Sequence, residues 1–162
     1  MTCPVRAKDE SEKTIRHGHP RYKNPCMAAQ SYVAHDLKTV RVVLADDHEV
    51  VRKGVRGLFD DHPRWTVCGE AENGIEAVDL VRELQPELVV LDISMPLMNG
   101  LQAAARIRQL ASSTKIVMLS MHNSRYVAQD ALDAGADIFL TKAQAGTELI
   151  RTIDSLFGET IE

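Results

Sequence analysis

The chain has 162 residues, of which 44% are hydrophobic and 26% charged, and its formal net charge at pH 7 is −4. This length suits one main domain and leaves little room for a second. The sequence has neither a run of about 18 apolar residues nor the apolar core of a signal peptide, so it indicates neither a membrane-spanning nor a secreted protein, and a cytoplasmic location is expected.

The first segment, residues 1–39, differs in composition from the rest. It holds seven Lys and Arg against four Asp and Glu, whereas residues 40–162 hold twelve against nineteen. Because it has little apolar periodicity, it is predicted to be a disordered extension. A basic arm that contacts nucleic acid is an alternative. A metal site is disfavoured, because the spacing of its candidate ligands fits no established pattern: Cys3, His17, His19 and Cys26.

From Val40 onward, short apolar runs alternate with segments of helical period. The predicted strands are Val40–Ala45, Trp65–Gly69, Leu88–Leu91, Ile116–Leu119 and Ile138–Thr141. The helical segments between and after them are indicated by apolar residues three or four positions apart: Val51, Val55 and Leu58; Ala77, Val78, Val81 and Leu84; Ala103, Ala104, Ile107 and Leu110; Val127, Ala131 and Ala134; Leu149, Ile150, Ile153, Leu156 and Phe157. The second helix is expected to begin at Asn73, with Glu76 as in a capping box, and to stop before Pro86.

Five strand and helix units with strands apolar on both faces predict an α/β fold, a doubly wound parallel sheet with helices on each side. The turn after the first strand, Ala45-Asp46-Asp47-His48, is acidic and not rich in glycine. Dinucleotide binding is therefore disfavoured. No Gly-x4-Gly-Lys-Ser/Thr loop occurs either, so the sequence does not support nucleotide hydrolysis of that kind.

Polar residues follow four of the apolar runs, where parallel strands end at one edge of a sheet and ligands bind: Asp46 with Asp47, Asp92, Ser120 and Lys142. Each aspartate alone is more often a turn residue or a helix cap. Together, converging carboxylates repel one another and require a proton or a cation. A divalent ion is the simplest answer, because oxygen ligands are those that Mg²⁺ prefers. A hydroxyl and an ammonium beside Mg²⁺ are what phosphoryl transfer requires.

The residues from about 40 to 158 resemble the receiver domains of two-component response regulators, in the subfamily that usually carries a LuxR-type helix-turn-helix. The resemblance rests on five stretches: Leu44-Ala45-Asp46-Asp47-His48, Val51-Arg52-Lys53-Gly54-Val55, Leu91-Asp92-Ile93-Ser94-Met95-Pro96-Leu97-Met98-Asn99-Gly100, Leu119-Ser120-Met121-His122, and Ala131-Leu132-Asp133-Ala134-Gly135-Ala136 leading to Lys142. It implies a five-stranded, flavodoxin-like parallel sheet with strand order 2-1-3-4-5.

The resemblance also implies roles for individual residues. Asp92 would take a phosphoryl group from a histidine kinase or a phosphotransfer protein and become an aspartyl phosphate. Asp46, Asp47 and Asp92, with the backbone carbonyl of Ser94, would bind the Mg²⁺ ion. Lys142 would offset phosphoryl charge, and Ser120 would hydrogen-bond a phosphoryl oxygen.

Other positions carry expectations about switching and lifetime. Phe139 stands where the family has an aromatic that changes rotamer with Ser120, but it lacks the phenol of a Tyr. Ser94 and His122 would flank the path of attacking water and set the phosphoryl lifetime. Many receivers have a cis proline after the lysine, whereas this chain has Ala143, so the loop there is expected either to have a different conformation or to contain an unusual cis bond.

The expected domain is the receiver, 40–158, followed by a tail, 159–162, with no output domain. The chain is thus predicted to be a solitary receiver or part of a truncated transcription regulator, without direct DNA binding or membrane contact. It would catalyse only its own phosphorylation and dephosphorylation, and phosphorylation would favour a homodimer through the first and fifth helices. Two alternatives stay open: a phosphatase of the haloacid dehalogenase type, which uses an Asp-x-Asp pair after the first strand, and a phosphorylation-independent interaction domain.

Overall fold

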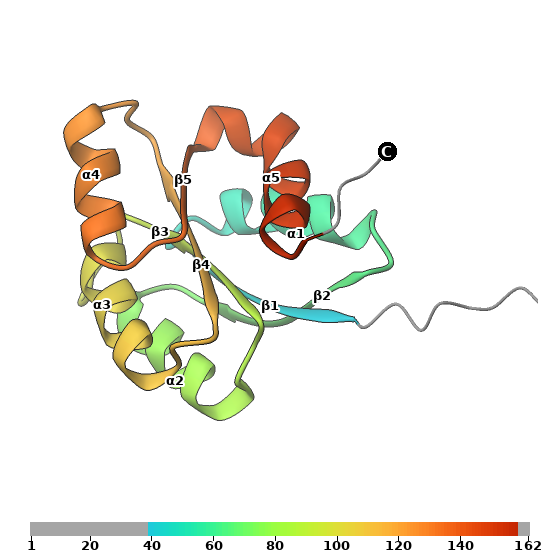
Figure 1. Ribbon diagram of the computed structural model, residues 1–162, viewed down its shortest axis with the longest axis horizontal. Helices are drawn as coiled ribbons and strands as arrows, with labels where there is room; N and C mark the ends of the chain where they lie inside the picture. Colours follow the sequence, from blue (N-terminus) through green and yellow to red (C-terminus); the bar gives the residue numbers. More distant parts are fainter. Residues whose placement is uncertain (1–38, 159–162) are drawn as a thin grey trace, which may run out of the picture. The chain divides into compact units, whose positions relative to one another are not determined.

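The structure is a computed structural model that describes residues 39–158. The predictions for the N-terminal extension, apart from residue 39, and for the tail 159–162 lie outside the described residues. Strands and helices alternate strictly along the chain (Figure 1). Their bounds are β1 Val40–Ala45, α1 Glu49–Asp60, β2 Trp65–Ala71, α2 Gly74–Leu84, β3 Leu88–Asp92, α3 Gly100–Leu110, β4 Lys115–Ser120, α4 Arg125–Asp133, β5 Ile138–Thr141 and α5 Lys142–Leu156.

All neighbouring strands of the five-stranded sheet are parallel, in the order β2-β1-β3-β4-β5. This confirms the predicted doubly wound α/β fold and its strand order. The chain proceeds from β1 to β2 on one side and then returns to β3 on the other side of β1. The order therefore reverses at β1, and the carboxyl ends of β1 and β3 border the crevice where such folds bind ligands.

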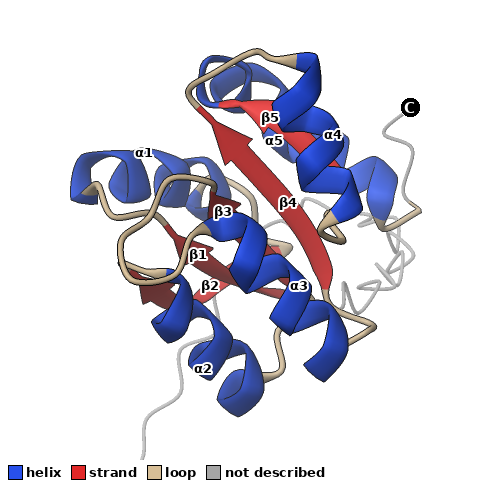
Figure 2. Cartoon of the chain, turned by 90° about the vertical axis from the view of Figure 1, so that its left-hand side faces the viewer, coloured by secondary structure: helices blue, strands red, loops and turns tan. Residues whose placement is uncertain are grey.

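Alternating side chains divide the interior into two apolar layers. Val89 and Leu91 of β3 point into the layer covered by α2, α3 and α4, the face that Figure 2 presents to the viewer. Leu88 and Val90 of the same strand point into the layer covered by α1 and α5. Because both faces of the central strands are buried, their sequences read as continuous apolar runs.

The junction between β5 and α5 differs from the expectation of a loop after Lys142. Strand β5 ends at Thr141 and helix α5 begins at the next residue, Lys142. Thr141 caps the helix: its hydroxyl accepts a hydrogen bond from the backbone N–H of Gln144 at 3.2 Å, and the Gln144 side chain accepts one from the N–H of Thr141 at 3.0 Å. This reciprocal capping box starts the helix without any connecting loop.

The predicted start of α2 is only partly as expected. Asn73 caps the helix by accepting a hydrogen bond from the backbone N–H of Glu76 at 3.0 Å. The Glu76 carboxylate, however, accepts from the N–H of Glu72, one residue before the cap. The pair therefore also ties down the loop that follows β2.

Candidate functional site

The sheet brings two buried aspartates together at the carboxyl ends of β1 and β3. Ala45 pairs with Leu91 across these strands, so the residues that follow, Asp46 and Asp92, are neighbours. Their exposed fractions are 5% and 3%. The ammonium nitrogen of Lys142, at the start of α5, lies 2.6 Å from Oδ2 of Asp46 and 3.2 Å from Oδ1 of Asp92. Three residues from distant parts of the sequence thus form one buried cluster of charges.

Burial and charge oppose each other in this cluster. Burial raises the pKa of the Asp92 carboxyl above its usual value, and although the Lys142 ammonium lowers this pKa, the Asp46 carboxylate raises it further. Burial disfavours the charged form of Lys142 too, but the carboxylates of Asp46 and Asp92 outweigh it and raise the pKa of this ammonium. Lys142 is therefore a cation at neutral pH, held between two carboxylates.

The oxygens at the end of β1 fit a divalent cation. Oδ1 of Asp46 accepts a hydrogen bond from the backbone N–H of His48 at 2.8 Å. Oδ2 of Asp46 is buried, and its partner is the Lys142 ammonium 2.6 Å away. Asp47, whose side chain is 31% exposed, stands beside it at the surface. A buried carboxylate next to an accessible one matches the oxygen-only ligation and the room for water that Mg²⁺ requires.

His48 belongs to this cluster, although no separate role was predicted for it. Its Nδ1 lies 2.8 Å from Oδ1 of Asp47 and 3.3 Å from Oδ1 of Asp46. One ligand atom from each of the three residues falls within 4.8 Å of the others. The sequence indicated its place in the cluster only by its position directly after the two aspartates.

The loop after β3 is packed closely against Asp92, and this requires a glycine at position 100. A Cβ atom at Gly100 would lie 2.2 Å from the carbonyl oxygen of Asp92, and the Gly100 N–H donates to the carbonyl of Ile93 at 2.9 Å. Within the same loop Ser94 is exposed, and its backbone contributes a hydrogen bond that lowers the pKa of Asp92. The Asn99-Gly100 part of the motif thus has a steric reason.

Leu97 in this loop is a feature that the sequence did not reveal. Its φ is +64°, in the left-handed region that disfavours residues with a side chain, and it is 82% exposed. Leucine at this φ is strained by roughly 1–3 kcal/mol. The surrounding loop therefore fixes its conformation, because the residue has no preference of its own for it.

Ser120 is the last residue of β4, and the structure brings it beside the end of β3, where Asp92 pairs with the preceding residue, Leu119. Its side chain is buried, and its Oγ accepts a hydrogen bond from the backbone N–H of His122 at 3.0 Å. His122 itself is exposed. Ser120 is thus near the charge cluster, and His122, which is hydrogen-bonded to it, lies at the surface.

Phe139 is half-buried in β5 and packs against the apolar layer under α2, α3 and α4. Met118 belongs to the same layer and precedes Ser120 by two positions, so Ser120 and Phe139 face the same side of the sheet. Position 139 therefore lies on the side of the sheet that α2, α3 and α4 cover.

Arg52 of α1 was quoted only as part of a motif, yet its guanidinium is buried at the edge of this site. It donates to the carbonyl oxygen of Asp46 at 2.6 Å. The burial of Arg52 could have been predicted from the sequence, because Arg52 has the helical spacing of the apolar stripe that includes Val55 and Phe59.

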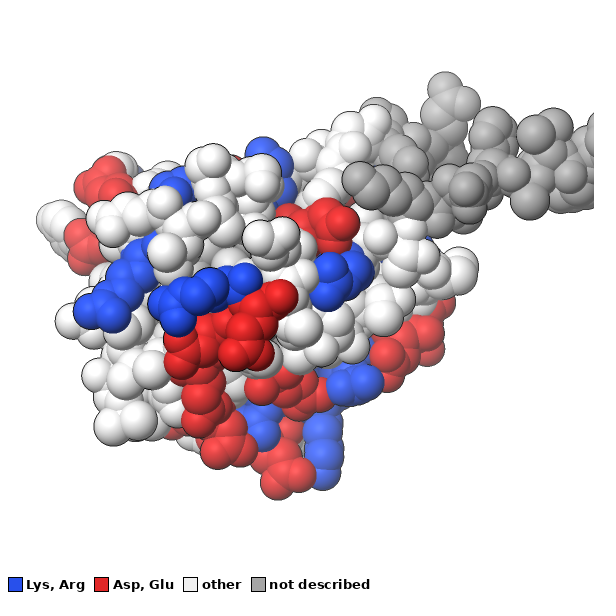
Figure 3. Space-filling model, turned by 90° about the horizontal axis from the view of Figure 1, so that it is seen from below, with Lys and Arg blue, Asp and Glu red and all other residues white. Residues whose placement is uncertain are grey.

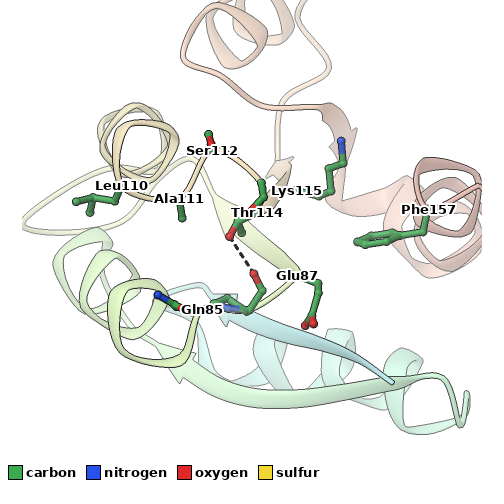
Figure 4. Close-up of a pocket in the computed structure, with 10 residues that line it drawn as sticks. Gln85, Glu87, Leu110, Ala111, Ser112, Thr114, Lys115 and Phe157 are labelled. Carbon is green, nitrogen blue, oxygen red and sulfur yellow. Dashed lines mark hydrogen bonds between the residues drawn. The ribbon is translucent and has the colours of Figure 1, made fainter. Parts of the chain in front are cut away.

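A separate hollow of about 540 Å³ lies at the amino ends of β3 and β4, away from the charge cluster (Figure 4). The polar groups around it are used in local hydrogen bonds: the Thr114 hydroxyl donates to the carbonyl of Pro86, and the Glu87 carboxylate accepts from the N–H of Arg41. These contacts fix the starts of the strands. The hollow is therefore not the candidate functional site, in spite of its volume.

The charge cluster and the doubly wound fold agree with the family that the comparison with known proteins identifies. The model of the response regulator receiver domain matches residues 42–154. The chain therefore belongs to the response regulator receiver family, whose domains act in signalling. No helix among residues 39–158 is long and apolar enough to cross a membrane.

The chain is similar to regulators of the LuxR and NarL type. The uncharacterized transcriptional regulatory protein YhcZ of Bacillus subtilis strain 168 is 39% identical over 120 residues, which are 74% of this chain and 56% of YhcZ. The nitrate/nitrite response regulator protein NarL of Escherichia coli K12 is 38% identical over 112 residues, 69% of this chain and 52% of NarL. The crystal structure of a LuxR-family two-component response regulator from Aurantimonas sp. SI85-9A1 is 36% identical with a TM-score of 0.69, over 73% of this chain and 84% of that one. The chain spans about half the length of the curated relatives it matches.

Proposed function

We propose that Asp92 is a phosphoacceptor, and that a histidine kinase or a phosphotransfer protein is its donor. The observation that supports this most directly is the Lys142 ammonium 3.2 Å from the Asp92 carboxylate, inside a buried cluster. An oxygen of Asp92 attacks the phosphorus of a phosphohistidine, a P–O bond forms, and the P–N bond breaks to release the imidazole. Lys142 stays a cation and neutralises charge on the phosphoryl oxygens.

Asp46, Asp47 and Asp92, with the backbone carbonyl of Ser94, are the proposed ligands of Mg²⁺. The bound ion would supply charge neutralisation for the incoming phosphoryl group. Asp46 offers a buried carboxylate, and Asp47 offers a carboxylate at the surface. Asp92 serves both the ion and the phosphoryl group, since a carboxylate has two oxygens.

Ser120 and Phe139 are the proposed switch. The Ser120 hydroxyl donates a hydrogen bond to a phosphoryl oxygen on Asp92, which draws the loop before α4 inward and changes the space open to Phe139. Both residues lie on the side of the sheet that α4 covers. Ser94 and His122 are exposed at the rim of the pocket, where they control access of water and thereby the lifetime of the aspartyl phosphate.

Self-association through α1 and α5 is the proposed response to phosphorylation. A groove of about 330 Å³ runs between these helices. Its lining is mostly apolar, with Lys142 as its one charged member: Val51, Gly54, Val55, Leu58, Met121, Lys142, Ala145 and Gly146. Because Lys142 belongs to both the groove and the charge cluster, a change around Asp92 reaches this surface directly.

The receiver itself is a poor candidate for direct contact with DNA. Residues 40–162 carry twelve Lys and Arg against nineteen Asp and Glu. Acidic side chains gather on one face with fewer basic ones among them (Figure 3), and a groove beside α2 is lined by Glu70, Glu76, Asp79 and Glu83. Such a surface repels phosphates. We expect the output to pass through protein contacts of the receiver, 40–158.

The test is phosphorylation by acetyl phosphate in the presence of Mg²⁺, followed by intact-protein mass spectrometry. Wild type should gain one acid-labile phosphoryl group, and Asp92→Asn should gain none, because an amide is not a competent nucleophile. Omission of Mg²⁺ should suppress the reaction. An unmodified wild type, or an equal yield in Asp92→Asn, would contradict the assignment.

A further inference from the structure

Arg52 occupies a position where an apolar residue would be expected. The buried residues of α1 are Arg52, Val55 and Phe59, spaced by three and four, so the arginine belongs to the stripe that faces the sheet. It is 7% exposed. A guanidinium at such a position is costly unless every face of it has a partner, and its presence requires an explanation.

The guanidinium is paired on three sides by groups from two other segments. Its Nη1 donates to the carbonyl oxygen of Asp46 at 2.6 Å, its Nη2 to the carboxylate of Glu72 at 3.0 Å, and its Nε to the carboxylate of Glu70 at 3.4 Å. Glu70 lies near the end of β2, and Glu72 lies in the loop beyond. Arg52 therefore connects α1, the end of β1 and the end of β2.

Arg52 contacts the backbone carbonyl of Asp46, and the backbone N–H of Asp46 is held by a second hydrogen bond. The N–H of Asp46 donates to the carbonyl of Ala71 at 3.1 Å. Because the peptide unit is planar, fixing the Asp46 carbonyl also fixes the orientation of the N–H of Asp47. The backbone that carries both acidic residues is thus held from two directions.

We infer that Arg52 is a positioning residue for the divalent cation site, which holds Asp46 and Asp47 in the orientation that binds Mg²⁺. This rests on the proposed function, because the ion is part of that proposal. The hydrogen bonds of the Arg52 side chain go to Asp46, Glu70 and Glu72 and not to Asp92. Arg52 acts through the Asp46 carbonyl. In other metal sites, residues that hydrogen-bond to the metal ligands orient those ligands in the same way.

The charge of Arg52 and its positioning role predict opposite changes in Mg²⁺ affinity when Arg52 is removed. A cation close to Mg²⁺ repels it, so loss of the charge alone would tighten Mg²⁺ binding. Loss of the hydrogen bonds releases the acidic backbone and weakens binding. Arg52→Lys separates the two effects further, since lysine keeps the charge but its compact ammonium cannot span the three acceptors that the planar guanidinium reaches.

The experiment is a titration of ¹⁵N-labelled protein with Mg²⁺ alone, followed by the amide shifts of Asp46, Asp47 and Ser94. We expect the dissociation constant of Mg²⁺ to rise by about 10-fold or more in both Arg52→Met and Arg52→Lys. Arg56→Met is the matched control, because Arg56 lies one turn further along α1 and binds Glu70 but not Asp46. It should bind Mg²⁺ like wild type.

A second measurement is the rate of phosphorylation by acetyl phosphate as a function of Mg²⁺. The Arg52 variants should need more Mg²⁺ for half of the maximal rate and should reach nearly the wild-type maximum. Unchanged or tighter Mg²⁺ binding in Arg52→Met, full rescue by Arg52→Lys, or a lower maximum with unchanged affinity would each overturn the inference.

Thermal unfolding shows whether the variants fold. If neither Arg52 variant does, Glu72→Gln decides the question, because Glu72 is an exposed partner of the guanidinium. It should weaken Mg²⁺ binding more than Asp79→Asn, which removes the same charge from a carboxylate that pairs with Arg82; equal effects would overturn the inference. A wild type that binds no Mg²⁺ would instead refute the proposed function itself.

Discussion

At the scale of the residue, Asp92 combines two requirements that conflict. A nucleophile must be ionised, but burial penalises the charged form, and the neighbouring Asp46 carboxylate adds repulsion. Lys142 offsets part of this cost, yet the pKa of Asp92 remains raised. The residue that would receive the phosphoryl group is therefore a place where the free protein is less stable than it could be, as is common at functional sites.

This cost predicts that Asp92→Asn stabilises the protein when no Mg²⁺ is present. A raised pKa means that the folded state holds the proton more tightly than the unfolded state, so ionisation costs stability as pH rises through the carboxyl range. At pH 7 the gain in the free energy of unfolding should be on the order of 1 kcal/mol, and it should disappear below about pH 4. Urea denaturation in a chelating buffer at both pH values measures it.

The matched control for this prediction is Asp79→Asn, a change of the same kind at an exposed carboxylate. It should alter the free energy of unfolding little at either pH. Added Mg²⁺ should narrow the difference between wild type and Asp92→Asn, because the ion stabilises only the form that binds it well. A less stable Asp92→Asn at pH 7 without Mg²⁺ would show that the ion pair with Lys142 outweighs burial.

At the scale of the element, α5 is what carries Lys142 to the carboxylates. The lysine occupies the first position of the helix, where the positive end of the helix dipole disfavours a cation. The nearby carboxylates compensate, and the helix end adds to the attraction of the site for an anion. The capping box of Thr141 and Gln144 therefore determines where the ammonium lies.

Thr141→Ala should lower the free energy of unfolding by about 1 kcal/mol, because it removes the helix cap. It should also slow phosphorylation at saturating Mg²⁺, since the first turn of α5 is then less well fixed. Thr141→Ser keeps the hydroxyl and is the control for both measurements. If Thr141→Ala were destabilised but reacted at the wild-type rate, the position of Lys142 would depend on its ion pairs alone.

The elements also show what could be predicted from the sequence. The central strands are apolar on both faces, so their runs and the polar residues at their ends revealed the sheet and the clustering of Asp46, Asp92 and Lys142. The start of α5 was missed, because Ala143 was compared with a proline and the Thr141-x-x-Gln144 spacing falls at the end of a strand. Arg52 was missed because Glu70 and Glu72, its partners, approach it only in the folded chain.

At the scale of the whole molecule, the groove between α1 and α5 is the surface that we expect to mediate self-association. Two glycines of α1 allow a matched test. A Cβ atom at either Gly54 or Gly57 would meet nothing within 4 Å, so both sites accept a larger side chain. Only Gly54 lines the groove.

Phosphorylated wild type should therefore show a larger mass in light scattering than the unphosphorylated protein. Gly54→Glu should abolish this increase, because it places a charge in an apolar groove. Gly57→Glu adds the same charge outside the groove and should leave the increase intact. Equal behaviour of the two variants would exclude the groove as the interface, and an unchanged mass of wild type would exclude the association itself.

The buried triad of Asp46, Asp92 and Lys142 also has a consequence for folding. A partly folded form in which α5 has detached would leave two adjacent carboxylates without their cation, at a cost that the complete fold avoids. The last helix therefore stabilises the receiver electrostatically as well as by apolar packing. We therefore expect sub-global opening of α5 to be penalised, so that the same three charges that suit a phosphoryl group favour folding and unfolding of the receiver as one cooperative unit.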